Sequence, residues 1–573
     1  MKYTLSYKEP LTHFLTINIE LEATEDEEVI DLQLPAWRPG RYQVANFAKN
    51  IRDISAKDEY GASLPINKVS KDRWQIHSKS RGKVLLEYEY FAHKMDAGNS
   101  WLDDHQVYVN FVNCMLYVPK NEPDPHVLEV IVPDDYKIIC ALPGRGRGGY
   151  HARDFQELAD SPVMASRTLR EWSYEVGDTV FHLWFEGEHL PDKERTIKAF
   201  TDFTVSQVEA MGPLPLQHYH FMFQLLPYKH YHGVEHKACT VITLGPDTKI
   251  NEEVFYNQFM GVSSHELFHA WNVCRLRPKE LLPYDFSREV VFETGFVAEG
   301  VTTYYGDLFL ARSGFFRASE YFEELNNTLA RFGMHDADHH TTLAKSSYDL
   351  WLDGYEAGVP DRKVSIYNEG AISALILDLM IRKISSDERS LDDVMRTLYN
   401  RFLDTGYTAD DYRQVAEEVA GEPLDEFFSD FIYGGMPVKK YLPELLGRMG
   451  LALEWVPGEE TAYIHRFGFR LGKKEKEMKV AHTAPGSEAE RVLSLEDELI
   501  AVNGRKLESD EDLNFYTGEI SLTLFRNDVL HTVVLSEDSE KFYTYGKIVP
   551  KEEASSEELS RMRLWLRGKS DKA

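Results

Sequence analysis

The spacing of apolar residues changes along the chain, and this change constrains the fold more than any other feature. Between Leu15 and Leu21 every second residue is apolar, as in a strand with one buried face. Two further segments, 84–91 and 128–133, gather β-branched and aromatic residues between turn signals. We therefore expect residues 1–170 to form an N-terminal β-sandwich-like domain.

The spacing becomes helical in the middle of the chain. Apolar residues recur every three or four positions through Val254–Trp271 and in several later stretches. Ser390 followed by Asp393 resembles a capping box, which also indicates helices in this part. We predict a second domain over 171–450, rich in strands up to about residue 250 and mostly helical afterwards.

A third pattern begins near residue 455, where short strand-like runs surround a turn-rich segment at 482–504. We expect a small third domain over 455–545. The remaining 546–573 is charged but carries a short apolar patch, so it is either a docking helix or a frayed tail. A chain of 573 residues is too long for one hydrophobic core, so the sequence predicts a multidomain α+β protein.

The charge balance limits the possible partners. With 94 acidic and 64 basic residues the formal net charge is −30, which disfavours nucleic acid and anionic membranes because both would repel the chain. The longest apolar stretch, around 370–381, is too short to span a bilayer. No charged start followed by an apolar block marks a signal peptide, and the four scattered cysteines fit reduced thiols. We expect a cytoplasmic protein, while a periplasmic or secreted location stays open.

The segment His265-Glu266-Leu267-Phe268-His269 indicates metal chemistry in the central domain. On a helix the two histidines lie on one face, so both imidazoles can bind a single ion. Glu266 is offset by about 100° and would lie beside the metal, where a general base for the attacking water is needed. Two histidines do not complete such a site, so a third ligand is required.

Glu299 is the candidate third ligand. It lies thirty positions after His269, within an apolar segment that predicts the next helix. Two histidines and a glutamate with one open coordination position are typical of hydrolytic zinc sites. The sequence therefore predicts one Zn²⁺ per chain, held by His265, His269 and Glu299. The alternative for Glu299 is an ordinary solvated charge on a helix.

These motifs resemble a known family. HELFHAWN at 265–272 followed by EGVTTYY at 299–305 is similar to the gluzincin peptidases, and within them to the glycyl aminopeptidase family M61. RLRPKELLPYDF at 275–286 and LPAWRPGRYQVANFAKNI at 34–51 resemble further segments of that family. The resemblance runs across the whole chain. It implies a thermolysin-like, mostly helical zinc peptidase domain and an aminopeptidase that removes small residues, Gly or Ala, from the N-termini of peptides.

The resemblance also implies how the substrate amine is bound. His232-Gly233-Val234-Glu235-His236 is similar to the family's GGVEH, whose Glu binds the free α-amino group. Glu235, with Gly233 beside it, would hold the amine and make the enzyme an exopeptidase. The family's first Gly is His232 here, a larger side chain that would either narrow the substrate cleft or alter the contact with the amine. Taken without the resemblance, Glu235 is an ordinary strand charge.

A tyrosine is implied as the partner of the oxyanion. Ser365-Ile366-Tyr367-Asn368-Glu369-Gly370 resembles the family pattern in which a Tyr stabilises the tetrahedral intermediate. Tyr367 would take that role. Glu369 stands where the family usually has Lys, so the local charge differs. The alternative is a tyrosine that only packs at the start of a helix.

The turn-rich segment at 482–504 looks like a PDZ domain, with Ala484-Pro-Gly-Ser487 and Ile500-Ala-Val-Asn-Gly504 as its motifs. Phe467, Gly468 and Phe469 would form the loop whose backbone amides capture a peptide or protein C-terminus. Such a module can recruit substrate, bind a partner or buttress the active site.

Three functions follow from these observations. The first is a zinc aminopeptidase acting on peptides. The second is a zinc endopeptidase to which the PDZ-like domain delivers unfolded chains. The third is a catalytically silent scaffold, which the joint presence of His265, Glu266, His269, Glu299 and Tyr367 disfavours.

Overall fold

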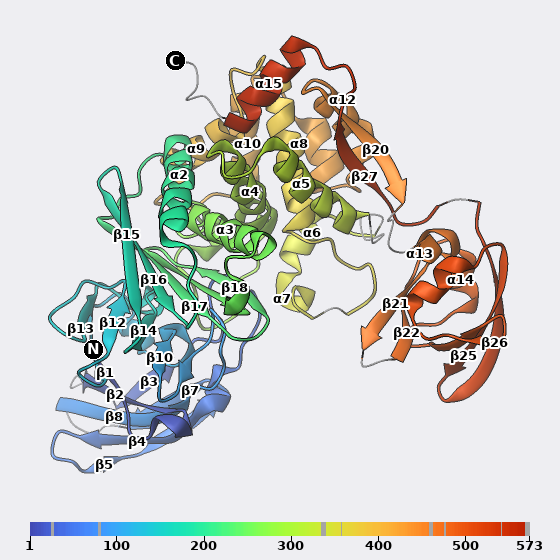
Figure 1. Ribbon diagram of the computed structural model, residues 1–573. Coiled ribbons are helices and arrows are strands. Elements are labelled where there is room, and N and C mark those ends of the chain that lie inside the picture. The colour runs from blue at the N-terminus through green and yellow to red at the C-terminus, as the bar shows by residue number, and fades with distance from the viewer. Residues whose placement is uncertain are drawn as a thin grey trace.

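The structure is a computed structural model that describes residues 1–23, 28–77, 82–333, 340–356, 358–457, 462–474, 477–539 and 541–567. Figure 1 shows a β-rich N-terminal part, a helical central part above it and a small module to one side of the helices. The expected multidomain α+β fold, with a β-rich N-terminal part followed by a helical part, is confirmed. The domain limits themselves stay predictions.

The N-terminal part contains a seven-stranded sheet in the order β13-β11-β1-β2-β8-β4-β5, with smaller sheets β12-β14-β10-β9 and β3-β7-β6. In β8 the side chains alternate between buried and outward positions, which is why the predicted segment 84–91 forms a strand. The strands and the short helix of this part are β1 (Lys2–Tyr7), β2 (Phe14–Ala23), β3 (Val29–Gln33), β4 (Ile51–Asp58), β5 (Ser63–Leu64), β6 (Ile66–Ser70), β7 (Arg73–His77), β8 (Gly82–Phe91), β9 (Trp101–Leu102), β10 (Gln106–Val109), β11 (His126–Val130), β12 (Lys137–Cys140), β13 (Gly149–Ala152), α1 (Phe155–Ala159) and β14 (Val163–Ser166).

A five-stranded sheet follows, in the order β15-β16-β17-β19-β18. Its strands are β15 (Arg170–Val176), β16 (Thr179–Glu186), β17 (His218–Leu225), β18 (His230–Glu235) and β19 (Cys239–Gly245). In Figure 1 helix α3 lies above this sheet, and β18 is the edge strand. Because β18 is at the edge and contacts α3, its side chains can reach residues of that helix.

Helices make up the rest of the central part. They are α2 (Lys193–Met211), α3 (Glu253–Phe268), α4 (Thr302–Arg312), α5 (Ala318–Phe332), α6 (Leu343–Tyr348), α7 (Leu350–Asp353), α8 (Asn368–Ile384), α9 (Leu391–Phe402), α10 (Ala409–Ala420), α11 (Asp425–Phe427) and α12 (Val438–Gly447). The predicted capping box is present, since Ser390 and Asp393 cap the start of α9. The apolar segments that predicted helices now line one continuous core between α3, α4 and α8.

Two paired strands, β20 (Leu451–Pro457) and β27 (Thr544–Pro550), lead out to the C-terminal module and back. The module has the sheet order β21-β22-β23-β25-β26, with β24 paired to β23. Its elements are α13 (Ala462–Phe467), β21 (Phe469–Lys474), β22 (Glu477–Thr483), α14 (Glu488–Val492), β23 (Glu498–Val502), β24 (Arg505–Lys506), β25 (Glu519–Arg526) and β26 (Val529–Ser536). Of the two alternatives for the C-terminal stretch, the described part is a docked helix, α15 (Ser556–Arg567), whose buried Trp565 donates to the Tyr304 hydroxyl at 2.9 Å.

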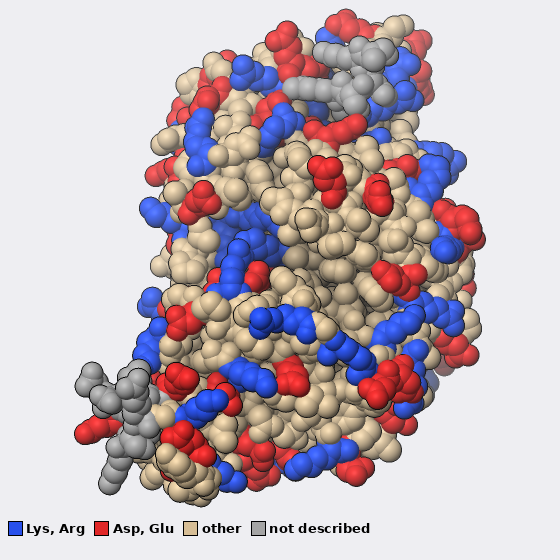
Figure 2. Space-filling model, turned by 90° about the vertical axis from the view of Figure 1, so that its left-hand side faces the viewer, with Lys and Arg blue, Asp and Glu red and all other residues tan. Residues whose placement is uncertain are grey.

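The excess of acidic residues does not form a single patch on the face shown in Figure 2. Acidic and basic side chains are mixed there, and Lys and Arg gather in a hollow near its middle. Within the described ranges, no helix combines the length and the apolar character needed to cross a bilayer. All four cysteines are buried and unpaired.

Candidate metal centre and active site

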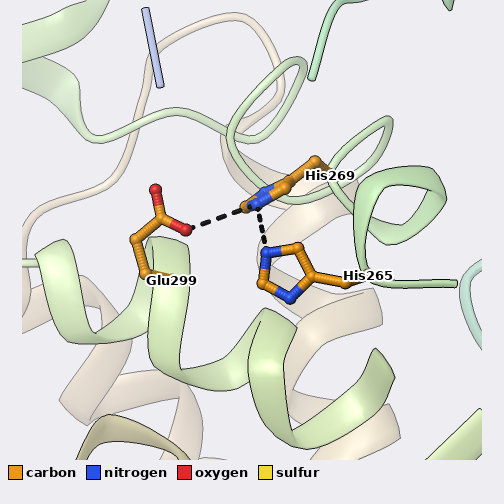
Figure 3. Close-up of side chains that lie close together, drawn as sticks. All are labelled: His265, His269 and Glu299. Atoms are coloured by element: carbon orange, nitrogen blue, oxygen red, sulfur yellow. Dashed lines mark hydrogen bonds and ion pairs between the residues drawn. The ribbon is translucent and has the colours of Figure 1, made fainter. Parts of the chain in front are cut away.

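Helix α3 carries the HExxH segment. His265 and Glu266 lie in its last turn, and His269 caps its C-terminus. The Nε2 atoms of the two histidines are 3.1 Å apart, and Glu299 Oε2 is 3.3 Å from Nε2 of His269. Figure 3 shows the three side chains converging on one point. The predicted ligands are therefore brought together, while metal binding by them remains a prediction.

The turn that carries Glu299 differs from the predicted helix. Residues Phe296–Val301 form a π-helical turn, which leads directly into α4. Such turns insert an extra residue and are frequent at functional sites. Gly300 of this turn touches Gly370 of α8, since a Cβ on Gly300 would lie 2.4 Å from the Gly370 Cα. This contact holds the helix after Tyr367 against the turn that bears Glu299.

Hydrogen bonds to neighbouring groups fix the orientation of the His269 ring. Its Nδ1 is 3.0 Å from the Asn272 carbonyl oxygen, so the Nδ1 proton is donated there and Nε2 is the nitrogen that faces His265 and Glu299. The Asn272 side chain in turn donates to the Val297 carbonyl at 2.8 Å and to the Thr302 hydroxyl at 3.0 Å. Asn272 thus ties the end of α3 to the element that carries Glu299.

Burial and charge shift the pKa values in opposite directions. Burial lowers the pKa of His265 well below its ordinary value. Burial acts the same way on His269, but the neighbouring Glu299 carboxylate overcomes it and raises the pKa of His269 to about 10. Nε2 of His269 and Oε2 of Glu299 lie 3.3 Å apart in this buried site. Metal binding at His269 must release its proton.

Two overlapping groups of side chains have ligand atoms within 4.8 Å of one another. One is His265, His269 and Glu299, and the other is Glu235, Glu266 and His269. The first is the better zinc set because it offers two imidazole nitrogens. The carboxylates of the second would then lie beside a bound metal rather than on it.

Both of those carboxylates are buried with an unbonded oxygen. Glu235 and Glu266 are each 6% exposed, and Oε1 of the first and Oε2 of the second have no hydrogen-bond partner among the described residues. Burial is the largest influence on both: it raises the pKa of Glu235 and raises the pKa of Glu266 to about 8. A carboxyl group with such a pKa can both accept and return a proton near neutral pH.

Gly233 lies directly against Glu266, as a Cβ at this position would be 2.1 Å from Glu266 Oε1. We expect Gly233→Ala to displace that carboxylate and to lower kcat by roughly 100-fold, while metal content stays unchanged. Gly144→Ala is the matched control because a Cβ at Gly144 meets nothing within 4 Å. Steady-state kinetics with metal analysis checks the result, and a wild-type kcat for Gly233→Ala would contradict it.

Tyr367 lies at the start of α8 and faces the same site. Its hydroxyl is a neighbour of the Tyr355 hydroxyl. Burial raises the pKa of Tyr367, with Glu299 as the second influence, so the hydroxyl keeps its proton and can act as a donor. Tyr355 was not among the residues singled out from the sequence.

A loop of the N-terminal part also reaches the site. The sequence analysis did not predict that this loop would contribute to the site. A Cβ at Gly40 would be 2.5 Å from Glu235 Oε2, so the loop backbone lies against the proposed amine anchor. The Tyr42 N–H donates to the Tyr355 hydroxyl at 3.3 Å. The signal was Gly40 inside WRPGRY, because a lone loop glycine often marks a close backbone approach.

The three residues proposed to bind a peptide terminus lie in the C-terminal module. The side chains of Phe467 and Phe469 are buried in its core. The Gly468 N–H donates to the Ile464 carbonyl at 2.9 Å, and the Gly468 carbonyl accepts from Ala484 at 2.7 Å. Both backbone groups of Gly468 therefore already have partners, and a role in peptide binding stays a prediction.

Two family models match parts of the chain. Residues 2–167 match the model of the peptidase M61 N-terminal domain, and residues 258–373 match the model of the M61 glycyl aminopeptidase. None of the curated proteins compared with the chain matches it.

Two of the solved structures that match the chain are the following. An aminopeptidase N family protein from Idiomarina loihiensis is 25% identical, with 99% of each chain covered and a TM-score of 0.90. An M1 zinc metallopeptidase variant from Deinococcus radiodurans, bound to a Tyr-Ser-Ala substrate, is 14% identical over 76% of this chain and 93% of that chain, with a TM-score of 0.47. With both M61 models matched in order and HExxH inside the second match, the chain is similar to the M61 glycyl aminopeptidase family and is a metallopeptidase.

Proposed function

We propose that the protein is a zinc-dependent aminopeptidase that removes small N-terminal residues, Gly or Ala, from peptides. The observation that carries this proposal is the pair of buried carboxylates, Glu235 and Glu266, each with an unbonded oxygen beside the histidines of α3. An unbonded buried carboxylate oxygen is costly unless a ligand completes it. A substrate ammonium and an attacking water are the two partners that peptide hydrolysis would bring.

One Zn²⁺ per chain fits the donor set. His265, His269 and Glu299 offer two nitrogens and one carboxylate, which is the set of three protein ligands found at hydrolytic zinc sites. When bound, zinc polarises the scissile carbonyl and lowers the pKa of water. We further propose that the helical domain around it is thermolysin-like.

The protein's own side chains would move the proton and hold the charges. Glu266 accepts the proton of the attacking water and then passes it to the leaving amine. Tyr367 donates its hydroxyl to the oxyanion of the tetrahedral intermediate. Glu235 pairs with the α-ammonium and so places the first peptide bond at the metal.

Paired substrates test the exopeptidase assignment. We expect Gly- and Ala-initiated peptides with a free amine to be cleaved at least about 100-fold faster than their N-acetylated forms. We expect Glu235→Gln to raise KM for free-amine peptides by roughly 10-fold to 100-fold and to reduce that preference, because a charged pair at the amine is lost. Glu171→Gln, in the same sheet, is the control. Equal cleavage of both substrate forms would favour an endopeptidase instead.

Tyr367→Phe tests the oxyanion partner. Removing one such donor typically lowers kcat by about 100-fold to 1000-fold, and we expect a loss in that range with KM changed little. The phenyl ring keeps the packing at the start of α8, so the thermal midpoint should stay near that of the wild type. Turnover at the wild-type rate would reduce Tyr367 to a packing residue.

For the C-terminal module we propose a PDZ-like fold. Its antiparallel sheet with two short helices, α13 and α14, supports this assignment. A bound peptide terminus at Phe467–Phe469 would have to use amides other than that of Gly468, which is already bonded.

A further inference from the structure

One loop connects the active site with the C-terminal module. Its described residues, 354–356 and 358–367, lie between α7 and α8 and include Tyr355 and Tyr367. The Tyr355 hydroxyl accepts the Tyr42 N–H at 3.3 Å, and the Tyr367 hydroxyl is its neighbour. The position of this loop therefore determines the position of Tyr367, the proposed oxyanion donor.

One side of the loop forms an ion pair and hydrogen bonds with the helical domain. Arg362 Nη2 is 2.8 Å from Asp349 Oδ2, and Lys363 Nζ donates to the Gly354 carbonyl at 2.6 Å. The Val364 N–H donates to the Ser346 hydroxyl at 3.0 Å. These bonds fix the second half of the loop, close to Tyr367.

The other side of the loop is hydrogen-bonded to the C-terminal module. Asp361 Oδ2 lies 2.6 Å from Nε2 of His482, a residue of β22, and Nδ1 of the same ring lies 2.6 Å from the Tyr543 hydroxyl. The side chains of Asp361 and His482 are only 12% and 10% exposed. A charge-assisted hydrogen bond in such a position is among the stronger ones in proteins. Figure 1 shows the loop reaching towards β21 and β22.

The module is itself a fixed support for this bond. Strand β27, which returns from the module, is held to α5 by Asn326, whose side chain accepts the Ile548 N–H at 2.6 Å and donates to the Ile548 carbonyl at 3.2 Å. The backbone of Gly333 packs on Tyr545. Because the strand beside Tyr543 is anchored, His482 can hold Asp361 at a defined place.

We propose that Asp361 and His482 are positioning residues for the peptidase reaction, through which the C-terminal module holds the loop of Tyr355 and Tyr367 at the metal centre. This inference rests on the proposed function, since it assumes that Tyr367 takes part in turnover. It assigns the module a role within the active site that is separate from any binding of peptide termini.

A double-mutant cycle in the full-length protein tests the proposal. We expect His482→Ala and Asp361→Asn each to lower kcat about tenfold with KM changed less than about twofold, because the oxyanion donor is displaced and not the amine anchor. In the Tyr367→Phe background, His482→Ala should have almost no further effect on kcat. His531→Ala, in the same module, is the control and should match the wild type.

The outcomes separate this inference from the proposed function. If the His482→Ala and Tyr367→Phe losses multiply, His482 has only a general structural role and the inference is overturned. If Tyr367→Phe turns over like the wild type, the proposed role of Tyr367 fails first, and the inference fails with it. Asp361→Asn keeps the size of the side chain, so it gives a folded variant for the same cycle if His482→Ala unfolds.

Discussion

Replacing Glu266 with Gln is expected to lower kcat by about 1000-fold while the metal stays bound. Glu266 lies next to His265 on α3 but outside the zinc set, so its loss removes proton transfer and leaves the ligands in place. A positioned general base contributes about 100-fold to 10,000-fold to such reactions. Gln has the same size and can still form hydrogen bonds, but it cannot accept the proton of water at neutral pH.

Kinetics on aminoacyl reporter substrates and metal analysis of the same samples measure this effect. Glu253→Gln is the matched control, since Glu253 is an exposed residue in the first turn of the same helix. Unchanged turnover in Glu266→Gln would rule out Glu266 as the general base and would favour the alternative of a catalytically silent scaffold. Loss of metal from Glu266→Gln would instead show that Glu266 is a ligand.

Replacing Glu299 with Gln is expected to abolish both metal retention and activity. Glu299 is 2% exposed and is the only carboxylate of the better zinc set. A neutral amide in its place would bind zinc more weakly and would leave the charge of the ion without a carboxylate to balance it. Because zinc binds the folded protein, losing the zinc also lowers the free energy of unfolding. At a free zinc concentration 1000 times Kd, bound zinc contributes about 4 kcal/mol to that free energy.

Metal content and thermal unfolding, each measured with and without chelator, check this expectation. The wild type should hold one zinc per chain and should unfold at a lower temperature after chelation, whereas Glu299→Gln should show little response. Glu293→Gln, an exposed position just before the same turn, should behave like the wild type. Full zinc occupancy in Glu299→Gln would remove Glu299 from the ligand set.

Much of the fold was predictable because the spacing of apolar residues along a helix or strand indicates which of its faces is buried. The alternation from Leu15 to Leu21 became part of β2, and the helical spacing after Val254 became α3. The π-helical turn at Phe296–Val301 was not predicted, because its apolar spacing looks like that of an ordinary helix. The C-terminal stretch stayed undecided until α15 was seen packed on Tyr304.

The sequence by itself determined the part of the site that one helical turn can bring together. His265, Glu266 and His269 must share a region of space wherever that helix lies, because a helix repeats every 3.6 residues. Only the tertiary structure decided the rest: Gly40 against Glu235, and Asp361 beside His482. These contacts join segments far apart in the chain. They depend on how whole domains pack, which no local spacing records.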